Sequence, residues 1–231
     1  MRKIGLIGGM SWLSTRTYYE YINKLVQARA GQRHSAPLLI ESLDSAGLSR
    51  LSSAEEWARA AQVLSASAQR LEAAGATALL IGTNSMHKVF DQVAASVGVP
   101  IIHIAECVAA RMAADGVKKA ALIGTRNVMT ESFYRQKLIA RDIELLPPEM
   151  QFVDTLDRII YDELLLGKAT RQSERELKTI LTNLDQDGAE AVVLGCTELE
   201  MVVDVDANVL PIYDCTRIHA EAAVDWIMGE G

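Results

Sequence analysis

Two strand-and-turn patterns recur in this chain in the same order, and this duplication limits the possible folds more than any other feature. Residues 75–84, GATALLIGTN, align without gaps onto residues 188–197, GAEAVVLGCT. Residues 3–9, KIGLIGG, resemble residues 119–125, KAALIGT, at nearly the same offset. A pattern that recurs at a fixed spacing indicates repeated structural units. The sequence therefore predicts duplicated halves.

The same repeats predict the domain organisation. Short apolar runs that end in turns and alternate with helical patterns are typical of an α/β fold with parallel sheets. We expect two pseudo-symmetric α/β halves that face each other across a cleft, which would place Thr83 and Cys196 on opposite walls of one pocket. Residues 1–100 form the first half and residues 101–214 the second, and a C-terminal helix at about 215–231 packs back on the first half.

Capping residues and apolar runs give the expected elements. Ser53 and Glu56 form a capping box for one helix, and Ser14 or Thr15 is expected to cap the helix after the first strand. Asp214 is expected to cap the last helix. Strands are expected at residues 4–8, 37–43, 77–82, 99–102, 119–124, 192–195 and 209–213. Single continuous helices are expected from the Thr83 turn through Val97, from Thr125 through Arg141, and over residues 150–166 and 170–187.

A buried run ends abruptly in polar residues at Cys196, Thr197 and Glu198. Ligands bind at the carboxyl ends of strands in parallel α/β sheets, so a thiol in this position is placed for chemistry. The other interpretation is that Cys196 is a small core residue, as most free cysteines are. Cys107 and Cys215 are expected to be structural, and His87 and His219 to cap or pack.

Composition restricts the classes of partner. The chain has 231 residues, 49% hydrophobic and 23% charged, with a net charge of −7 and three cysteines. These values exclude a largely disordered chain and disfavour nucleic-acid binding. We find no signal peptide, no apolar run near the roughly 18 residues of a membrane helix, and no zinc or dinucleotide motif. We expect a reduced cytoplasmic protein without metal or cofactor, and the sequence leaves a homodimer open.

Three segments resemble the cofactor-independent aspartate/glutamate racemases. Residues 195–198, GCTE, correspond to the glycine-cysteine-threonine-acid run of that family. Residues 83–87, TNSMH, stand where the family has cysteine-asparagine-threonine/serine, and residues 7–12, IGGMSW, resemble its beginning. The resemblance covers most of the chain.

This resemblance implies a pyridoxal-independent racemisation of aspartate or glutamate. Such a reaction needs one acid/base group on each side of the α-carbon. Cys196 is implied to act on the L isomer, with a pKa that a helix N-terminus or nearby donors can lower, and Thr83 takes the opposite side. The substrate is expected to contact Met10, Arg50, Ser52, Asn84, Ser85, Thr125, Thr197 and Glu198.

Two departures from the family pattern leave alternatives open. Thr83 replaces the first cysteine, and its hydroxyl is a far poorer acid or base than a thiol, so we expect slower, lopsided activity. Aspartate-selective members carry a lysine where this chain has Leu165, which weakens strict aspartate recognition unless Arg50 substitutes. A single-cysteine decarboxylase or cis–trans isomerase of the same superfamily is the alternative enzyme, and a non-catalytic amino-acid-binding protein is the third interpretation.

Overall fold

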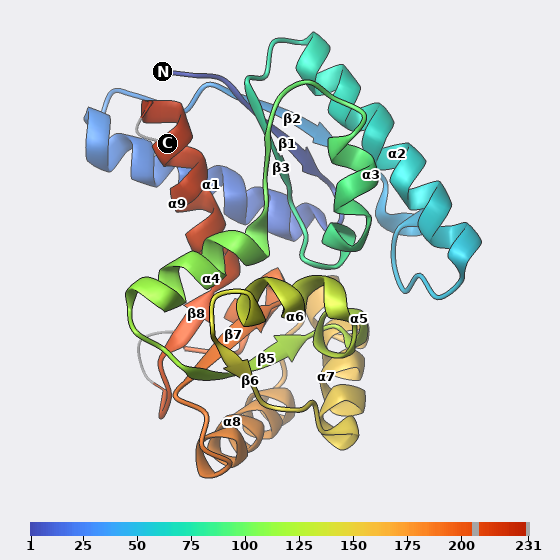
Figure 1. Ribbon diagram of the computed structural model, residues 1–231, viewed down its shortest axis with the longest axis vertical. Coiled ribbons are helices and arrows are strands. Elements are labelled where there is room, and N and C mark those ends of the chain that lie inside the picture. Colours follow the sequence, from blue (N-terminus) through green and yellow to red (C-terminus); the bar gives the residue numbers. More distant parts are fainter. Residues whose placement is uncertain (205–207, 230–231) are drawn as a thin grey trace. The chain divides into compact units, whose positions relative to one another are not determined.

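The computed structural model describes residues 1–204 and 208–229 and contains two compact α/β units (Figure 1). Unit 1 comprises Met1–Ile104 and the segment that begins at His219, and unit 2 comprises Ala105–Ile218. Residues 230 and 231, at the end of the expected C-terminal helix, lie outside the described residues. Each unit has a four-stranded parallel sheet, which confirms the predicted α/β class.

The two sheets have the same topology. Their strand orders are β2-β1-β3-β4 and β6-β5-β7-β8, so the second strand of each unit takes an edge and the third lies beside the first. The strands are β1 (Ile4–Gly8), β2 (Leu38–Ser42), β3 (Ala78–Ile81), β4 (Ile101–Ile102), β5 (Lys119–Gly124), β6 (Glu144–Leu145), β7 (Ala191–Gly195) and β8 (Ile212–Asp214). The duplicated sequence patterns therefore correspond to β1 with β5 and to β3 with β7.

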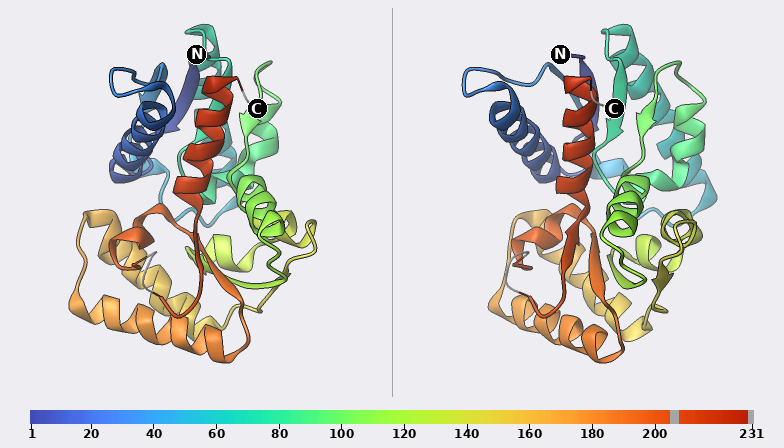
Figure 2. Two further views of the ribbon diagram at one scale, coloured as in Figure 1. Left: turned by 90° about the vertical axis from the view of Figure 1, so that its left-hand side faces the viewer. Right: turned by 60° about the vertical axis from the view of Figure 1, so that its left-hand side comes forward.

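Helices cover both faces of the unit 1 sheet. Apolar side chains of α2 (Ala54–Ala73), η2 (Ser85–Val89) and α3 (Phe90–Ala94) pack on one face around Ile7 and Leu79. On the other face, α1 (Trp12–Ala30) and α9 (Cys215–Met228) pack around Leu6 and Leu80. Figure 2 shows α9 lying beside α1. The C-terminal helix α9 thus completes the core of unit 1, which the N-terminal elements β1 and α1 begin.

The core of unit 2 lies between its sheet and two amphipathic helices. Side chains of α7 (Met150–Asp162) and α8 (Arg171–Gln186) pack with those of β5 and β7 and with η4 (Thr197–Met201). Cys196 belongs to this core, and Leu165 packs against it. The remaining helices are η1 (Ser45–Gly47), α4 (Ile104–Ala114), α5 (Arg126–Thr130), α6 (Ser132–Ile139) and η3 (Leu164–Leu166).

Several helix ends differ from the expectation. The cap of α1 is Ser11, whose hydroxyl accepts from the Ser14 amide, and not Ser14 or Thr15. The helix expected through Val97 is instead η2 followed by α3, which ends at Ala94. The helix expected through Arg141 breaks where Glu131 adopts an extended backbone, and α7 ends at Asp162, before η3. Local hydrogen bonds and packing, which periodicity does not encode, set these ends.

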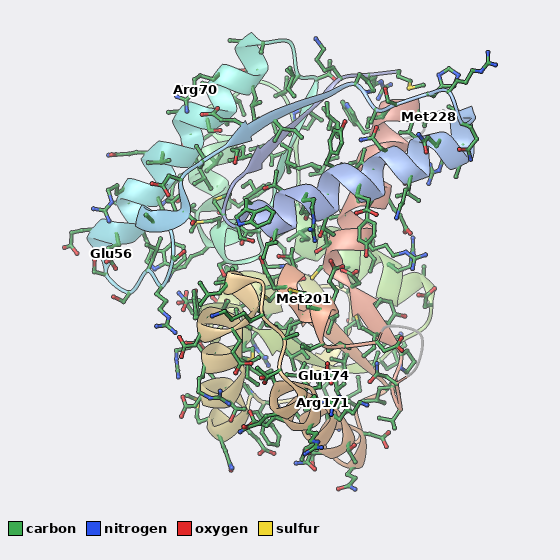
Figure 3. The ribbon with its side chains drawn as sticks, turned by 180° about the vertical axis from the view of Figure 1, so that it is seen from behind. Glu56, Arg70, Arg171, Glu174, Met201 and Met228 are labelled. Carbon is green, nitrogen blue, oxygen red and sulfur yellow. The ribbon has the colours of Figure 1, made fainter. Side chains whose placement is uncertain are left out.

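Other local predictions are confirmed. Ser53 and Glu56 form the reciprocal capping box at the start of α2, where Figure 3 labels Glu56. Asp214 accepts from the Thr216 and Arg217 amides at the start of α9. Within the described part of the chain, no helix has the length and apolar character needed to cross a membrane.

Candidate active site

In unit 2, two neighbouring strands end at the same edge of the sheet and each leads into a candidate site residue. Gly124 of β5 pairs with Gly195 of β7, so Thr125 and Cys196 follow adjacent strand ends. A Cβ atom on Gly124 would lie only 2.7 Å from the Gly195 carbonyl oxygen. Glycine is therefore required where these strands approach, and both Thr125 and Cys196 are buried at this edge.

The Cys196 thiol has a hydrogen-bond acceptor in place. Its Sγ donates to Oε2 of Glu198 over 3.2 Å, and the Thr197 hydroxyl donates to the same oxygen over 2.6 Å. All three side chains are buried, with Cys196 7% exposed. Glu198 therefore contacts the thiol directly, whereas the sequence had suggested only substrate contact for this residue.

Burial raises the pKa of the Cys196 thiol well above its ordinary value, and the neighbouring Glu198 carboxylate raises it further. Backbone donors at the start of a helix can lower a thiol pKa, which the sequence suggested here. The Glu198 backbone amide does lower the thiol pKa here, but this effect is smaller than those of burial and of the Glu198 carboxylate charge, which raise it. The substrate-free thiol is therefore protonated at neutral pH and needs a proton acceptor before it can act as a base.

In unit 1, the turn after β3 carries the second cluster of candidate residues. The last ladder hydrogen bond of this strand runs from the Gly82 amide to the Ile7 carbonyl, and Thr83 and Asn84 follow at once. Asn84 is 2% exposed, and neither Nδ2 nor Oδ1 has a hydrogen-bond partner within the described residues. A buried amide without partners costs free energy, so it is suited to a polar ligand. Thr83 and Ser85 flank it and are half-buried.

The other three candidates of unit 1 lie in or near the chain that follows β1 and β2. Met10 packs in the apolar cluster with Leu48 and Leu51. The Ser52 hydroxyl donates to Glu56 over 3.2 Å and so takes part in capping α2. Arg50 is exposed and has a left-handed backbone, with φ of 51°.

The turn before Met10 requires glycine. Gly9 has φ of 84°, and a Cβ atom there would lie 2.1 Å from the Leu43 carbonyl oxygen. The Gly9 amide donates to the Thr15 hydroxyl over 2.7 Å. The chain therefore passes tightly from β1 into α1 against the end of β2.

A buried group of histidines in unit 1 was not assigned a site role from the sequence. The rings of His87 and His103 have centroids 4.6 Å apart, and His87 and His219 are 6.0 Å apart. Burial is the main cause that lowers the pKa of His87 well below its ordinary value and that of His219 to about 4. The four-residue spacing of His87 from Thr83 could have suggested their contact from the sequence. His219 is remote in sequence from both, so no local pattern could have placed it in this group.

Unit 2 has a surface hollow of about 430 Å³. It is lined by residues of α8 and of the chain around the end of η4, including Lys178, Asn208, Glu174 and Met201, the last two of which Figure 3 labels. Cys196 is not among the residues that line it. Across residues 1–204 and 208–229, no group of three or more histidine, cysteine or acidic side chains is arranged to hold a metal ion.

Comparison with known proteins gives consistent matches over most of the chain. The Asp/Glu/hydantoin racemase family model matches residues 7–223. A Yersinia pestis structure, described provisionally as an Asp/Glu racemase, is 38% identical with a TM-score of 0.90, covering 99% of this chain and 100% of that chain. An aspartate racemase homologue from Pyrococcus horikoshii OT3 is 30% identical with a TM-score of 0.85 and the same coverage. The broad specificity amino-acid racemase RacX of Bacillus subtilis (strain 168) is 23% identical over 159 residues, which are 68% of this chain and 67% of RacX.

Proposed function

Since this chain belongs to the Asp/Glu/hydantoin racemase family, we propose that it is a pyridoxal-independent amino-acid racemase with aspartate and glutamate as its expected substrates. The observation that carries this proposal is the buried Cys196 thiol with the Glu198 carboxylate 3.2 Å from its sulfur. A general base must lie within hydrogen-bond reach of the proton that it takes. Glu198 meets this condition for the thiol proton.

The proposed reaction moves one proton on each side of the α-carbon. Glu198 first accepts the Cys196 proton, and the thiolate then takes the α-hydrogen of the L isomer, so that the C–H bond breaks and an S–H bond forms. The electron pair is delocalised into the α-carboxylate as an enediolate. Thr83 donates its hydroxyl proton to the opposite face, directly or through a water molecule, and is reprotonated from water. Glu198 returns the proton that it accepted to water, so the free protein is restored with no net gain or loss of protons.

Donors aimed at the α-carboxylate stabilise the enediolate. Asn84 supports this role because both ends of its buried amide have no partner in the described structure. An amino acid carries both complements, since its carboxylate accepts from the amide nitrogen and its ammonium group donates to the amide oxygen. We propose that Asn84 binds the substrate in this way, with Ser85, Thr125 and Thr197 as further donors.

Thr83 makes the two sides of the reaction unequal in rate but not in equilibrium. Its hydroxyl is a poor base, so removal of the α-hydrogen from the D isomer is the slower chemical step. Enantiomers have equal free energies, so the catalytic efficiencies in the two directions must be equal. Any apparent one-way behaviour therefore comes from different saturation, slow turnover or inactivation.

Three features bear on which side chain the substrate carries. Leu165 packs against the apolar core of unit 2, where aspartate-selective relatives carry a lysine. RacX is described as broad in specificity, which supports a pocket that accepts several amino acids. We propose Arg50 as the group that recognises a side-chain carboxylate.

The three cysteines are free, which supports a reducing cytoplasmic location.

Proton NMR in heavy water tests the proposal. L-aspartate and D-aspartate, and then the glutamate isomers, are incubated separately with the protein and with the Cys196→Ser variant. We expect deuterium to enter the α-carbon with the wild-type protein only. Exchange at equal rates in the variant would remove Cys196 from the reaction. Tight binding without exchange would favour an amino-acid-binding protein, and carbon dioxide release from a malonate would favour a single-cysteine decarboxylase.

A further inference from the structure

His87 makes two hydrogen bonds that together fix its tautomer. The Ile104 amide donates to His87 Nε2 over 3.2 Å, so Nε2 carries no proton. Nδ1 lies 2.9 Å from the Thr83 carbonyl oxygen, which can only accept, so Nδ1 carries the proton and donates it. His87 is 2% exposed, and water does not compete for either bond. The ring is therefore neutral and connects the Thr83 turn to the junction of β4 and α4.

His219 makes the equivalent pair of bonds on the other side of the same junction. Its Nε2 donates to the Ile102 carbonyl over 2.9 Å, so its Nδ1 accepts from the Tyr18 hydroxyl over 2.7 Å. The two histidines thus hold the carbonyl of residue 102 and the amide of residue 104, with only residue 103 between them. Two pairs of hydrogen bonds, joined by the backbone of residues 102–104, therefore connect Tyr18 on α1 to the Thr83 carbonyl within unit 1.

The last of these hydrogen bonds holds the Thr83 carbonyl, which lies just beyond the end of β3. The Gly82 amide makes the last ladder bond of β3, so Thr83 lies beyond the support of the sheet. The next fixed point is its carbonyl, which the His87 ring holds, while the His87 amide donates to the Asn84 carbonyl over 3.1 Å. His87 therefore fixes two consecutive peptide units that carry the proposed acid/base hydroxyl and the unpartnered amide.

We propose that His87 is a positioning residue for the Thr83 side of the reaction: through the Thr83 carbonyl it holds the hydroxyl where it can return a proton to the substrate. This inference rests on the proposed function. It makes His87 specific to one face of the α-carbon, because the two hydrogen bonds of its ring go to the Thr83 carbonyl and the Ile104 amide, whereas Cys196 belongs to unit 2. A role in folding alone would lower both proton transfers together.

Two substitutions separate the effects of the two hydrogen bonds that the His87 ring makes. The amide of asparagine reaches about as far as Nδ1 of a histidine, and that of glutamine about as far as Nε2. His87→Asn therefore retains a donor for the Thr83 carbonyl, and His87→Gln retains an acceptor for the Ile104 amide but loses the bond to Thr83. His34→Gln, on an exposed loop, is the matched control.

The measurement is a partition ratio with the L substrate in heavy water. Formation of the D isomer requires the Thr83 side, whereas deuterium in the remaining L isomer reports only return of a proton by Cys196. The ratio of these initial rates does not depend on the folded fraction of a variant. We expect His87→Gln to lower the ratio about tenfold, as a displaced catalytic group does, and His87→Asn and His34→Gln to stay within about twofold of wild type.

An unchanged ratio in His87→Gln would overturn the proposal even if the total exchange rate fell. Nitrogen-15 NMR of the wild-type protein provides a test that no folding defect can obscure: we expect the His87 proton on Nδ1, and a proton on Nε2 would overturn the assignment. If the wild-type protein exchanges no amino acid at all, the proposed function itself fails, and the role of His87 fails with it. A normal wild-type exchange with an unaltered ratio rejects the positioning role alone.

Discussion

The Cys196 thiol donates its proton toward Oε2 of Glu198 over 3.2 Å, and the same carboxylate is one reason that the thiol pKa is raised. The carboxylate thus has two opposing effects on catalysis. It disfavours the thiolate in the free protein, and it offers a hydrogen-bonded group that can accept the thiol proton. A substitution that removes its charge separates the two effects.

We predict that Glu198→Gln lowers the pKa of the Cys196 thiol but also lowers α-hydrogen exchange from the L isomer by about a hundredfold, because a general base is lost. The pH dependence of alkylation by iodoacetamide reports the thiol pKa, with Cys196→Ser giving the background of Cys107 and Cys215. Glu200→Gln, in the same short helix, is the matched control and should leave exchange nearly unchanged. Faster exchange in Glu198→Gln would mean that the carboxylate only opposes the reaction.

Thr83 gives a second prediction. Thr83→Cys should raise α-hydrogen exchange from the D isomer by about tenfold or more, because a thiol is a far better proton carrier than a hydroxyl. Thr83→Val has a similar shape without the hydroxyl, and it should abolish exchange of the D isomer while the L isomer still exchanges with retention. Proton NMR in heavy water with each pure isomer measures both. No gain in Thr83→Cys would contradict the assignment of Thr83 to the D side.

The third prediction concerns Arg50. A guanidinium that binds the side-chain carboxylate contributes about 1.5–3 kcal/mol, so Arg50→Gln should raise KM for aspartate roughly tenfold to a hundredfold. Homoserine lacks that carboxylate, and its KM should not change. Arg59→Gln, on the exposed surface of α2, controls for the loss of positive charge. Equal effects on aspartate and homoserine would remove Arg50 from the site.

The sequence predicted the sheets and the two candidate turns because these features are local or repeated. The runs before Thr83 and Cys196 are apolar, end in glycine and match each other, which is enough to predict strands that end at ligand-binding edges. The capping box of Ser53 and Glu56 was predictable for the same reason, since its partners are three residues apart.

Contacts between remote residues could not be predicted in this way. His219 meets Tyr18 and Ile102 only because α9 returns to unit 1 after the whole of unit 2. The direction of the Cys196 pKa shift also required the structure, because it depends on burial and on which side chain the thiol contacts. Spacing alone cannot distinguish a helix start that lowers a thiol pKa from one where burial and a single contacting carboxylate, here that of Glu198, raise it.

The close approach of β1 to the end of β2 gives a prediction on stability. Gly9→Ala should lower the free energy of unfolding by about 2–4 kcal/mol, because it combines the cost of a left-handed backbone with an overlap against Leu43. Gly116 has a similar φ of 78° but no atom within 4 Å of a Cβ position, so Gly116→Ala should cost only about 1–2 kcal/mol. Urea unfolding measures both. Equal losses would show that the chain near Leu43 relaxes without cost.

The last prediction concerns the pH dependence of stability, which His219 should dominate together with His87. The unfolded pKa of histidine is about 6.5, and His219 titrates at about 4 in the folded protein, where Tyr18, His87 and His103 surround it. The unfolded chain therefore binds more protons between these values. The stability that neutral His219 provides is complete above pH 6.5 and is lost as the pH falls toward 4, by about 2 kcal/mol between pH 7.5 and 5.

His219→Gln retains a donor for the Ile102 carbonyl and does not titrate, so its unfolding free energy should fall by about 2 kcal/mol less over this interval. His34→Gln should follow the wild-type curve. Parallel curves for wild type and His219→Gln would show that the buried imidazole takes up its proton in the folded protein as easily as in the unfolded chain.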